Sequence, residues 1–375
     1  MTFSVRPVDA TDNGAINALH RSVGWPTRSE AGWNWLASNP ARLETTAPAG
    51  WLVEAEDGEP CGFAGNFVQR FHHGDRILYG ATGFSIIITP RARGRSLKLL
   101  NTFARQPEMF AHYVFNANPR SSPLYKRHGM IAWPPETHDV KLSWRVDALA
   151  CAGGRLWREI DRRVPRLTEA RAERLLNPRL HEPETLDLPT GVAILTDLTD
   201  LADRTPYADF WQALKGEGRL IADRSPAMLR WRLVDPDLTL RPLVLAFNRG
   251  ETISGYAMAM MSKGNPIEPP MLEIVDLAAL DDEPRAIPAL IQALLANARR
   301  LGAAKLRIQT VNPELLRRMG PLADTARREG GWGHCHVKFD PDTPGTETWS
   351  PTPYDGDYGI CLRPVPVAVS ERRAA

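Results

Sequence analysis

The sequence predicts an α+β fold with two domains, each a mixed, mostly antiparallel sheet flanked by helices. The chain has 375 residues, and a single hydrophobic core rarely keeps growing to that length. Residues 1–148 alternate strand and helix patterns in the order β-α-α-β-β-β-α-β-α-β-β, which already makes a complete domain. The same kind of alternation restarts at Gly191.

The first predicted domain covers residues 1–148. Its apolar run Ile86-Ile87-Ile88 is typical of a strand that is buried on both faces. Ser29 is a candidate cap for a helix that ends before Asn39-Pro40. We expect strands at 3–8, 51–55, 61–71, 79–89, 113–115, 131–133 and 140–146, and helices at 13–22, at 29–37, from about Leu97, and around Tyr125 up to Gly129.

Residues 149–190 are predicted to connect the domains. Arginine is dense between Arg155 and Arg174, where scattered Leu and Ile favour a helix, and the stretch that follows is rich in Pro and Glu. The second predicted domain then covers residues 191–375, with a tail rich in Pro and Gly after Gly331 and a possible last strand at 358–362.

Two pairs of short, similar segments predict an internal repeat. The tryptophan-rich helix that closes at Asn39-Pro40 resembles a later segment around Trp231 that closes at Asp235-Pro236. The segment from Asn118-Pro119 to Gly129 likewise resembles the one from Asn312-Pro313 to Gly320.

Composition excludes several classes of protein. The four cysteines are far apart and form no CxxC pair, which argues against a disulfide framework or a zinc knuckle. No apolar run of membrane-spanning length occurs, and the N-terminus carries no apolar leader pattern, so we expect a cytoplasmic protein with no membrane span. The formal net charge of +2 gives no reason to expect nucleic acid as a partner, and the oligomeric state is left open.

The turn after the apolar strand is the strongest functional signal. Pro90 ends the strand, and the basic segment from Arg91 to Ser96 leads into a helix that starts near Leu97. Free N–H groups at a helix N-terminus and nearby arginines attract anions, so this turn predicts a phosphate-binding site. The alternative reading is a solvated, arginine-rich loop.

The strand, basic turn and helix, followed by a second strand, Asn116 and the sequence Leu124-Tyr125-Lys126-Arg127-His128-Gly129, resemble the GNAT acyltransferase superfamily. In that family the turn holds the pyrophosphate of acetyl-CoA. Pro90, Arg93 and Gly94 match its pattern, whereas Ser96 and Lys98 stand where the family has glycine. Ser96 keeps its N–H, but Lys98 has to point away from the phosphates or join the contacts.

The resemblance implies an acyl-CoA-dependent N-acyltransferase, with acetyl-CoA or another acyl-CoA as co-substrate and no metal. Tyr125 is then the general acid that protonates the CoA thiolate. The general base is not placed, since the strand from Phe84 to Thr89 carries no acid, and Ser85, His112 or a water chain stay open. The implied cofactor-binding residues are Ile86, Ile88, Arg91, Arg93, Gly94, Arg95, Ser96, Leu97 and Asn116.

The second domain is predicted to be a degenerate copy that does not bind acyl-CoA. Its corresponding turn carries Asp281-Asp282-Glu283, which would repel pyrophosphate, and Leu316 stands where the tyrosine would be. His334-Cys335-His336 is read as structural: neighbouring strand residues point to opposite faces, so His334 and His336 could share a metal but Cys335 could not join them.

The expected acceptor is the amine of a small molecule or amino sugar. Two alternatives stay open: a catalytically degenerate binding or scaffold protein of the same fold, and a Fem-type aminoacyl transferase.

Overall fold

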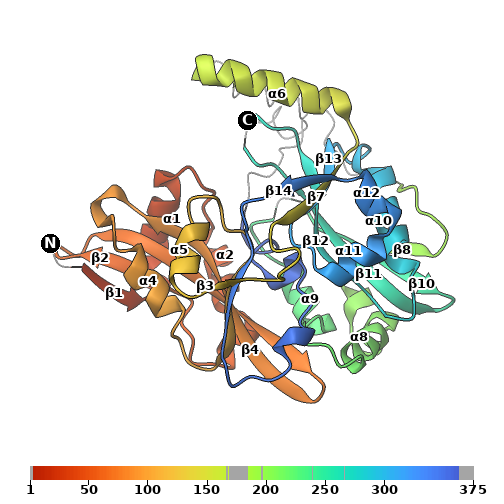
Figure 1. Cartoon of the computed structure of the whole chain (residues 1–375), viewed down its shortest axis with the longest axis horizontal. Helices are drawn as coiled ribbons and strands as arrows, with labels where there is room; N and C mark the ends of the chain where they lie inside the picture. Colours follow the sequence, from red (N-terminus) through yellow and green to blue (C-terminus); the bar gives the residue numbers. More distant parts are fainter. Residues whose placement is uncertain are drawn as a thin grey trace.

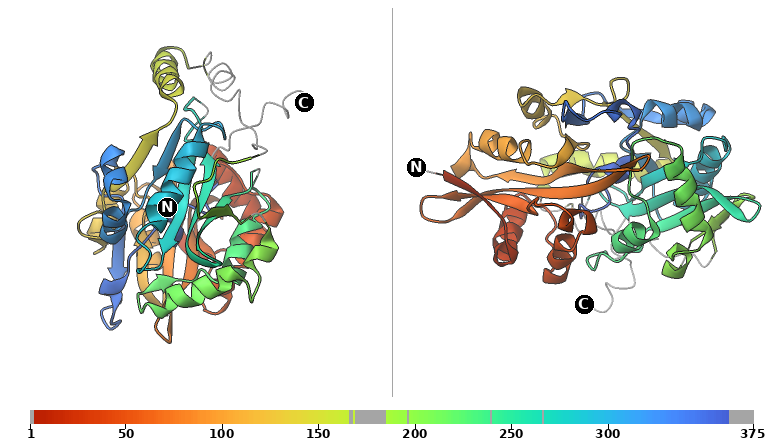
Figure 2. Two further views of the ribbon diagram at one scale, coloured as in Figure 1. Left: turned by 90° about the vertical axis from the view of Figure 1, so that its right-hand side faces the viewer. Right: turned by 90° about the horizontal axis from the view of Figure 1, so that it is seen from below.

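The computed structural model describes residues 3–165, 168, 185–195, 197–238, 240–265 and 267–362. Two sheets, each flanked by helices, lie side by side, and a segment near the C-terminal end of the described chain runs between them (Figures 1 and 2). The predicted α+β class with two mostly antiparallel sheets is confirmed.

The first sheet has the order β1-β2-β3-β4-β5-β15-β6, and β9 pairs with β3 at its side. Only β4 and β5 are parallel neighbours among the described strands of this sheet, and the other pairs are antiparallel. Its strands are β1 (Phe3–Pro7), β2 (Gly50–Ala55), β3 (Pro60–His73), β4 (Arg76–Ile88), β5 (Met109–Val114), β6 (Ile131–Ala132), β9 (Ile221–Ala222) and β15 (His336–Phe339).

The second sheet has the order β14-β7-β13-β12-β11-β10-β8. Here too one described pair, β12 with β13, is parallel. Its strands are β7 (Val140–Arg145), β8 (Val192–Ile194), β10 (Leu243–Arg249), β11 (Thr252–Ser262), β12 (Met271–Ala279), β13 (Lys305–Ile308) and β14 (Arg327–Gly330). The internal repeat stays a prediction, and the matching strand order is the observation that supports it.

The two sheets exchange one strand each. We expected residues 140–146 to complete the first sheet, but β7 lies between β13 and β14 in the second sheet. In return β15, from the tail that we assigned to the second domain, pairs with β5 and β6 of the first sheet. Val140, Leu142 and Trp144 are buried in the core of the second sheet, which explains their apolar pattern. A boundary at residue 148 therefore does not separate the two sheets.

Helices cover both sheets (Figure 2). The predicted cap of α2 is confirmed, since the Ser29 hydroxyl accepts a hydrogen bond from the Gly32 N–H at 2.9 Å. The helices, including the 3-10 turns η, are η1 (Ala10–Asp12), α1 (Asn13–Ser22), α2 (Glu30–Ala37), α3 (Pro40–Leu43), η2 (Pro90–Ala92), α4 (Ser96–Phe103), α5 (Ser122–Arg127), α6 (Ala148–Arg163), η4 (Leu198–Leu201), α8 (Pro206–Gly216), α9 (Pro226–Leu233), α10 (Ala286–Ala298), α11 (Pro313–Met319), α12 (Pro321–Thr325), η5 (Thr346–Thr348) and η6 (Pro353–Asp355).

The structure tests the predicted connector only in part, and it corrects the predicted last strand. The first part of the predicted connector forms α6, whereas most of the arginine-rich stretch beyond it and the start of the Pro- and Glu-rich segment lie outside the described residues. The predicted last strand at 358–362 is instead a turn segment, because its residues bond to their own neighbours, as the Ile360 and Cys361 N–H groups do to the Asp357 carbonyl.

The two helices with similar sequences, α2 and α9, pack together. The Trp35 ring of α2 stacks on the Trp231 ring of α9 with centroids 4.4 Å apart. Beside them the buried guanidinium of Arg28 pairs with the buried Asp235 carboxylate at 3.0 Å. These contacts fix the two halves against each other and so hold the segment that runs between them in place.

Candidate active site

The parallel strands β4 and β5 separate part of the way along their length. They pair from Tyr79 to Thr82, and beyond that point β4 pairs only with β3. At the same place β4 has a β-bulge, because Ser85 and Ile86 both lie opposite Ala64. Ser85 has φ 49°, a left-handed conformation that is rare for a residue other than glycine. The half-exposed edge of β4 therefore has no strand partner on the β5 side beyond Thr82, and this separation of the two strands is called the gap below.

The basic turn lies at the end of β4. Gly94 has φ +87°, which only glycine adopts without strain, and α4 begins two residues later. No side chain caps α4, and within the described chain the N–H groups of Gly94, Ser96 and Leu97 make no hydrogen bond. Arg93 is exposed and forms no ion pair with a described acid. The turn thus presents free N–H groups and positive charge to solvent.

The arginines of this turn differ in their partners. Arg91 forms ion pairs with Asp57 and Glu59 of the turn between β2 and β3, and these acids raise the pKa of its guanidinium. The Arg95 guanidinium lies over the Phe3 ring at 4.9 Å, and Lys98 Nζ donates to the Phe3 carbonyl at 3.3 Å. Lys98 therefore points toward β1 and away from the N-terminus of α4.

Tyr125 lies on α5 with its side chain almost fully buried. Its ring stacks on His336 of the exchanged strand β15, with centroids 5.7 Å apart. Burial raises the pKa of Tyr125 well above its usual value, and the nearby charge of Asp357 raises it further. The hydroxyl accordingly keeps its proton throughout the neutral range.

Asp357 is a residue of the candidate site that we did not predict from the sequence. Asn116, which follows β5, donates a hydrogen bond from its side-chain amide to Asp357 Oδ2, and the thiol of Cys361 approaches the same oxygen at 3.1 Å. Oδ1 is buried without a hydrogen-bond partner. Burial raises the pKa of Asp357 to about 6.

The segment that carries Asp357 is fixed on both sides. The Tyr358 hydroxyl donates to the Phe115 carbonyl at 2.6 Å, and Arg28 donates to the Ile360 carbonyl. Cys361 also lies within hydrogen-bonding reach of Ser85 at the bulge. The C-terminal segment thereby brings a carboxylate to the gap between β4 and β5. The motif Asp355-Gly356-Asp357 was visible in the sequence, but nothing in it shows that Asn116 is its neighbour.

The two histidines of the His334-Cys335-His336 segment, which we read as structural, each have a hydrogen-bonding partner within the protein. His334 Nε2 lies 2.6 Å from the Gln309 carbonyl, and His336 Nε2 lies 3.0 Å from the Ser122 hydroxyl. Among the described residues no group of three or more His, Cys, Asp or Glu side chains could hold a metal ion. In the same part of the chain, none of the helices combines the length and apolar character needed to cross a bilayer.

Several solved structures of proteins named N-acyltransferases or N-acetyltransferases have a similar fold. Yeast (Saccharomyces cerevisiae) N-myristoyltransferase with bound myristoyl-CoA aligns with a TM-score of 0.51 at 11% identity, over 89% of this chain and 78% of that one. A probable N-acyltransferase of Enterococcus faecalis and a GCN5-related N-acetyltransferase of Anabaena variabilis each align with a TM-score of 0.51 at 12% identity, over 90% of this chain and 73% of theirs. No protein-family model matches the sequence, and no curated protein is significantly similar to it.

Proposed function

The chain has the GNAT fold, and we propose that it is an acyl-CoA-dependent N-acyltransferase whose active site is the gap between β4 and β5. The observation that carries the proposal is that an anion-binding turn and a set of proton-transfer groups lie at the two ends of this gap. A basic turn with free N–H groups lies at one end, and Asn116, Tyr125 and Asp357 lie at the other.

The proposed cofactor site follows β4 to the N-terminus of α4. The pyrophosphate of acetyl-CoA or another acyl-CoA would bind the N–H groups of Gly94, Ser96 and Leu97, with Arg93 and Arg95 adding charge. The unpaired edge at Ile86 and Ile88 would hold the pantetheine arm. Arg91 would contribute least, because two acids already bind its guanidinium.

The proposed reaction is direct transfer of the acyl group. The amine nitrogen forms a bond to the thioester carbonyl carbon, and the bond from that carbon to sulfur breaks. Asp357 takes the proton that the amine loses, since a pKa of about 6 leaves it ionised and still basic near neutral pH. Tyr125 gives its proton to the departing thiolate, and the proton that Asp357 has taken then restores the Tyr125 hydroxyl, so both groups return to their starting states. The second sheet then has a structural role, consistent with its acidic turn.

Titration of the full chain with acetyl-CoA in a calorimeter tests the proposal. We expect one CoA molecule per chain, and release of free CoA thiol when a suitable amine from a mixed panel of small amines and amino sugars is added. Two molecules per chain would contradict the structural role of the second sheet. No heat and no thermal shift would favour the degenerate scaffold instead.

A further inference from the structure

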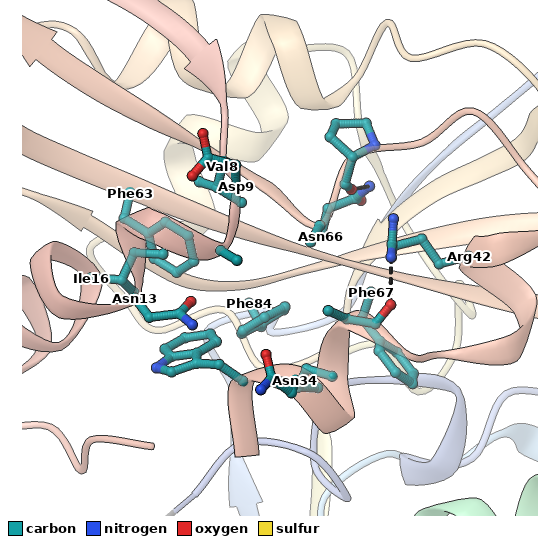
Figure 3. A pocket seen from close by; sticks show the side chains of 16 residues that line it. Val8, Asp9, Asn13, Ile16, Asn34, Arg42, Phe63, Asn66, Phe67 and Phe84 are labelled. Atoms are coloured by element: carbon teal, nitrogen blue, oxygen red, sulfur yellow. Dashed lines mark hydrogen bonds between the residues drawn. The ribbon is translucent and has the colours of Figure 1, made fainter. Parts of the chain in front are cut away.

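A pocket of about 240 Å³ lies beneath the first sheet, between β3 and β4 on one side and α1, α2 and α3 on the other (Figure 3). One wall is aromatic and consists of Trp33, Phe63, Phe67 and Phe84. Polar side chains from the three helices and from the turn after β1 complete it. Figure 3 shows the asparagines of α1 and α2, Asn13 and Asn34, on the helix side of the Phe84 ring.

The pocket adjoins the proposed reaction centre. Phe84 immediately precedes Ser85 at the bulge, and its ring packs edge-on against Phe63 with centroids 6.3 Å apart. Phe84 and Phe63 belong to the core beneath α1 and α2, whereas α4 packs on the core of the opposite face of the sheet. A molecule in the pocket would therefore approach the gap from the face opposite to the basic turn.

Arg42 gives the pocket its charge. Its guanidinium donates to the Ala37 carbonyl and makes no ion pair with a described acid, and its Nε atom is buried without a hydrogen-bond partner. Burial without a nearby carboxylate lowers the pKa of Arg42 and leaves its charge uncompensated. Asp9, at the opposite end in Figure 3, is already bonded to the Thr11 N–H and hydroxyl. Asp9 keeps its own negative charge, so the positive charge of the pocket lies at its α3 end, around Arg42.

These features select one kind of occupant. An aromatic wall binds an apolar or aromatic body, and an unpaired guanidinium binds a carboxylate or another acidic group. The side-chain amides of Asn13 and Asn34, which make no hydrogen bond to described protein atoms, can bind further polar groups. A saturated acyl chain offers no acceptor to the half-buried guanidinium of Arg42, so it fits less well.

We infer that this pocket binds the amine substrate, and that the substrate is a primary amine with an apolar or aromatic body and an acidic group, as in an amino acid. Calling this molecule a substrate rests on the proposed acyltransferase function. Binding of such a molecule does not depend on acyl transfer, so the pocket can be tested separately.

Calorimetry on the full chain without CoA provides that test. The probes are L-phenylalanine and L-leucine, each compared with its decarboxylated amine, phenethylamine or isoamylamine. We expect at least one amino acid to bind about tenfold more tightly than its decarboxylated partner. Arg42→Gln should remove this preference, and Arg42→Lys should keep part of it. Arg93→Ala is the matched control, because it removes a charge on the other face and should leave amino-acid binding unchanged.

A second variant covers the case in which Arg42→Gln does not fold. Ala37 is exposed at the rim of the pocket, so Ala37→Trp should block the pocket without disturbing the core and should abolish amino-acid binding. Equal affinity for each acid and its decarboxylated partner, or binding that survives Ala37→Trp, would overturn the inference. The inference would also be overturned if decanoyl-CoA bound more tightly than acetyl-CoA and Ala37→Trp removed that difference, because the pocket would then hold the acyl chain. Amino-acid binding that needs Arg42, without any CoA binding, would uphold the pocket and refute the acyltransferase.

Discussion

The two parallel strand pairs of this protein separate in the same way but differ in the side chains that surround the separation. In the second sheet, β12 and β13 pair from Met271 to Ile274 and then separate, and β12 has a bulge at Val275, as β4 has at Ser85. The first gap is bordered by half-exposed residues and a basic turn. At the second gap, buried side chains bond across the opening and leave a cavity of only about 50 Å³.

Side chains of η6 close the second gap. The Thr352 hydroxyl donates to Asp276 of β12 at 2.8 Å, and the fully buried Arg224 binds Asp276 at 2.8 Å and approaches Asp355 at 3.5 Å. At the end of β12, Arg318 donates to the carbonyls of Ala279, Leu280 and Glu283, where a nucleotide would need free N–H groups. The comparison teaches that a separation of parallel strands does not by itself make an anion site, because the first ends at free N–H groups and arginines whereas the second ends at carbonyls that Arg318 already binds.

The largest expected effect tests the carboxylate at the first gap. Asp357→Asn should lower kcat at pH 7.5 by about 100-fold or more, with little change in the Kd for acetyl-CoA, because the amide cannot accept the proton of the amine. For the wild type, kcat should rise with pH through about 6, the pKa of Asp357, and the variant should lose this rise. Stopped assays of CoA release between pH 5 and 8.5 measure both.

Stability separates this loss from unfolding. A carboxyl whose pKa is raised in the folded state stabilises the protein at low pH and loses that contribution as pH rises through the folded pKa. Asp357→Asn should therefore be more stable than the wild type at pH 8, by at most about 3 kcal/mol, and the difference should vanish at acidic pH. A variant that keeps full activity would exclude Asp357 as the base.

The next effect tests the filled gap. Arg224→Met should lower the free energy of unfolding by about 3–5 kcal/mol, because it leaves the buried Asp276 and Asp355 carboxylates without their cation. Urea unfolding monitored by tryptophan fluorescence measures it. The double variant Arg224→Met with Asp276→Asn should recover part of the loss, and neither variant should bind a second CoA. A loss below about 1 kcal/mol would show that the network does not hold the gap closed.

Tyr125→Phe should have a smaller effect on the chemistry. We expect kcat to fall about tenfold, since a water molecule can replace the hydroxyl as proton donor, while the Kd for acetyl-CoA stays within about twofold. The buried ring and its packing on His336 are retained, so folding should be unaffected. Turnover equal to that of the wild type would remove Tyr125 from the mechanism.

The smallest effect distinguishes two arginines of the same turn. Arg93→Ala should raise the Kd for acetyl-CoA about fivefold, and less so at high salt, because its exposed charge is free to approach the phosphates. Arg91→Ala should change it by less than about twofold, since Asp57 and Glu59 already neutralise that residue. Equal effects of the two substitutions would mean that the basic turn rearranges when the nucleotide binds.

Local patterns predicted much of this architecture. The apolar run at Ile86, the break at Pro90 and the cap at Ser29 act over a few residues, and the strand and helix that they predict are present. The partners of a strand depend on distant residues, so the pattern of residues 140–146 predicted β7 but not its sheet. Asp357 was missed for the same reason, because 241 positions separate it from Asn116.

The exchange of β7 and β15 also has a consequence for biosynthesis. A ribosome releases the chain from the N-terminus, and most multidomain chains fold each domain as soon as it has emerged. Here the first sheet cannot be completed until Phe339 has left the exit tunnel, and Asp357 emerges later still. Nascent or prematurely terminated chains would therefore expose the open edge of β5 and lack the carboxylate, so catalytic competence would arise only near the end of translation.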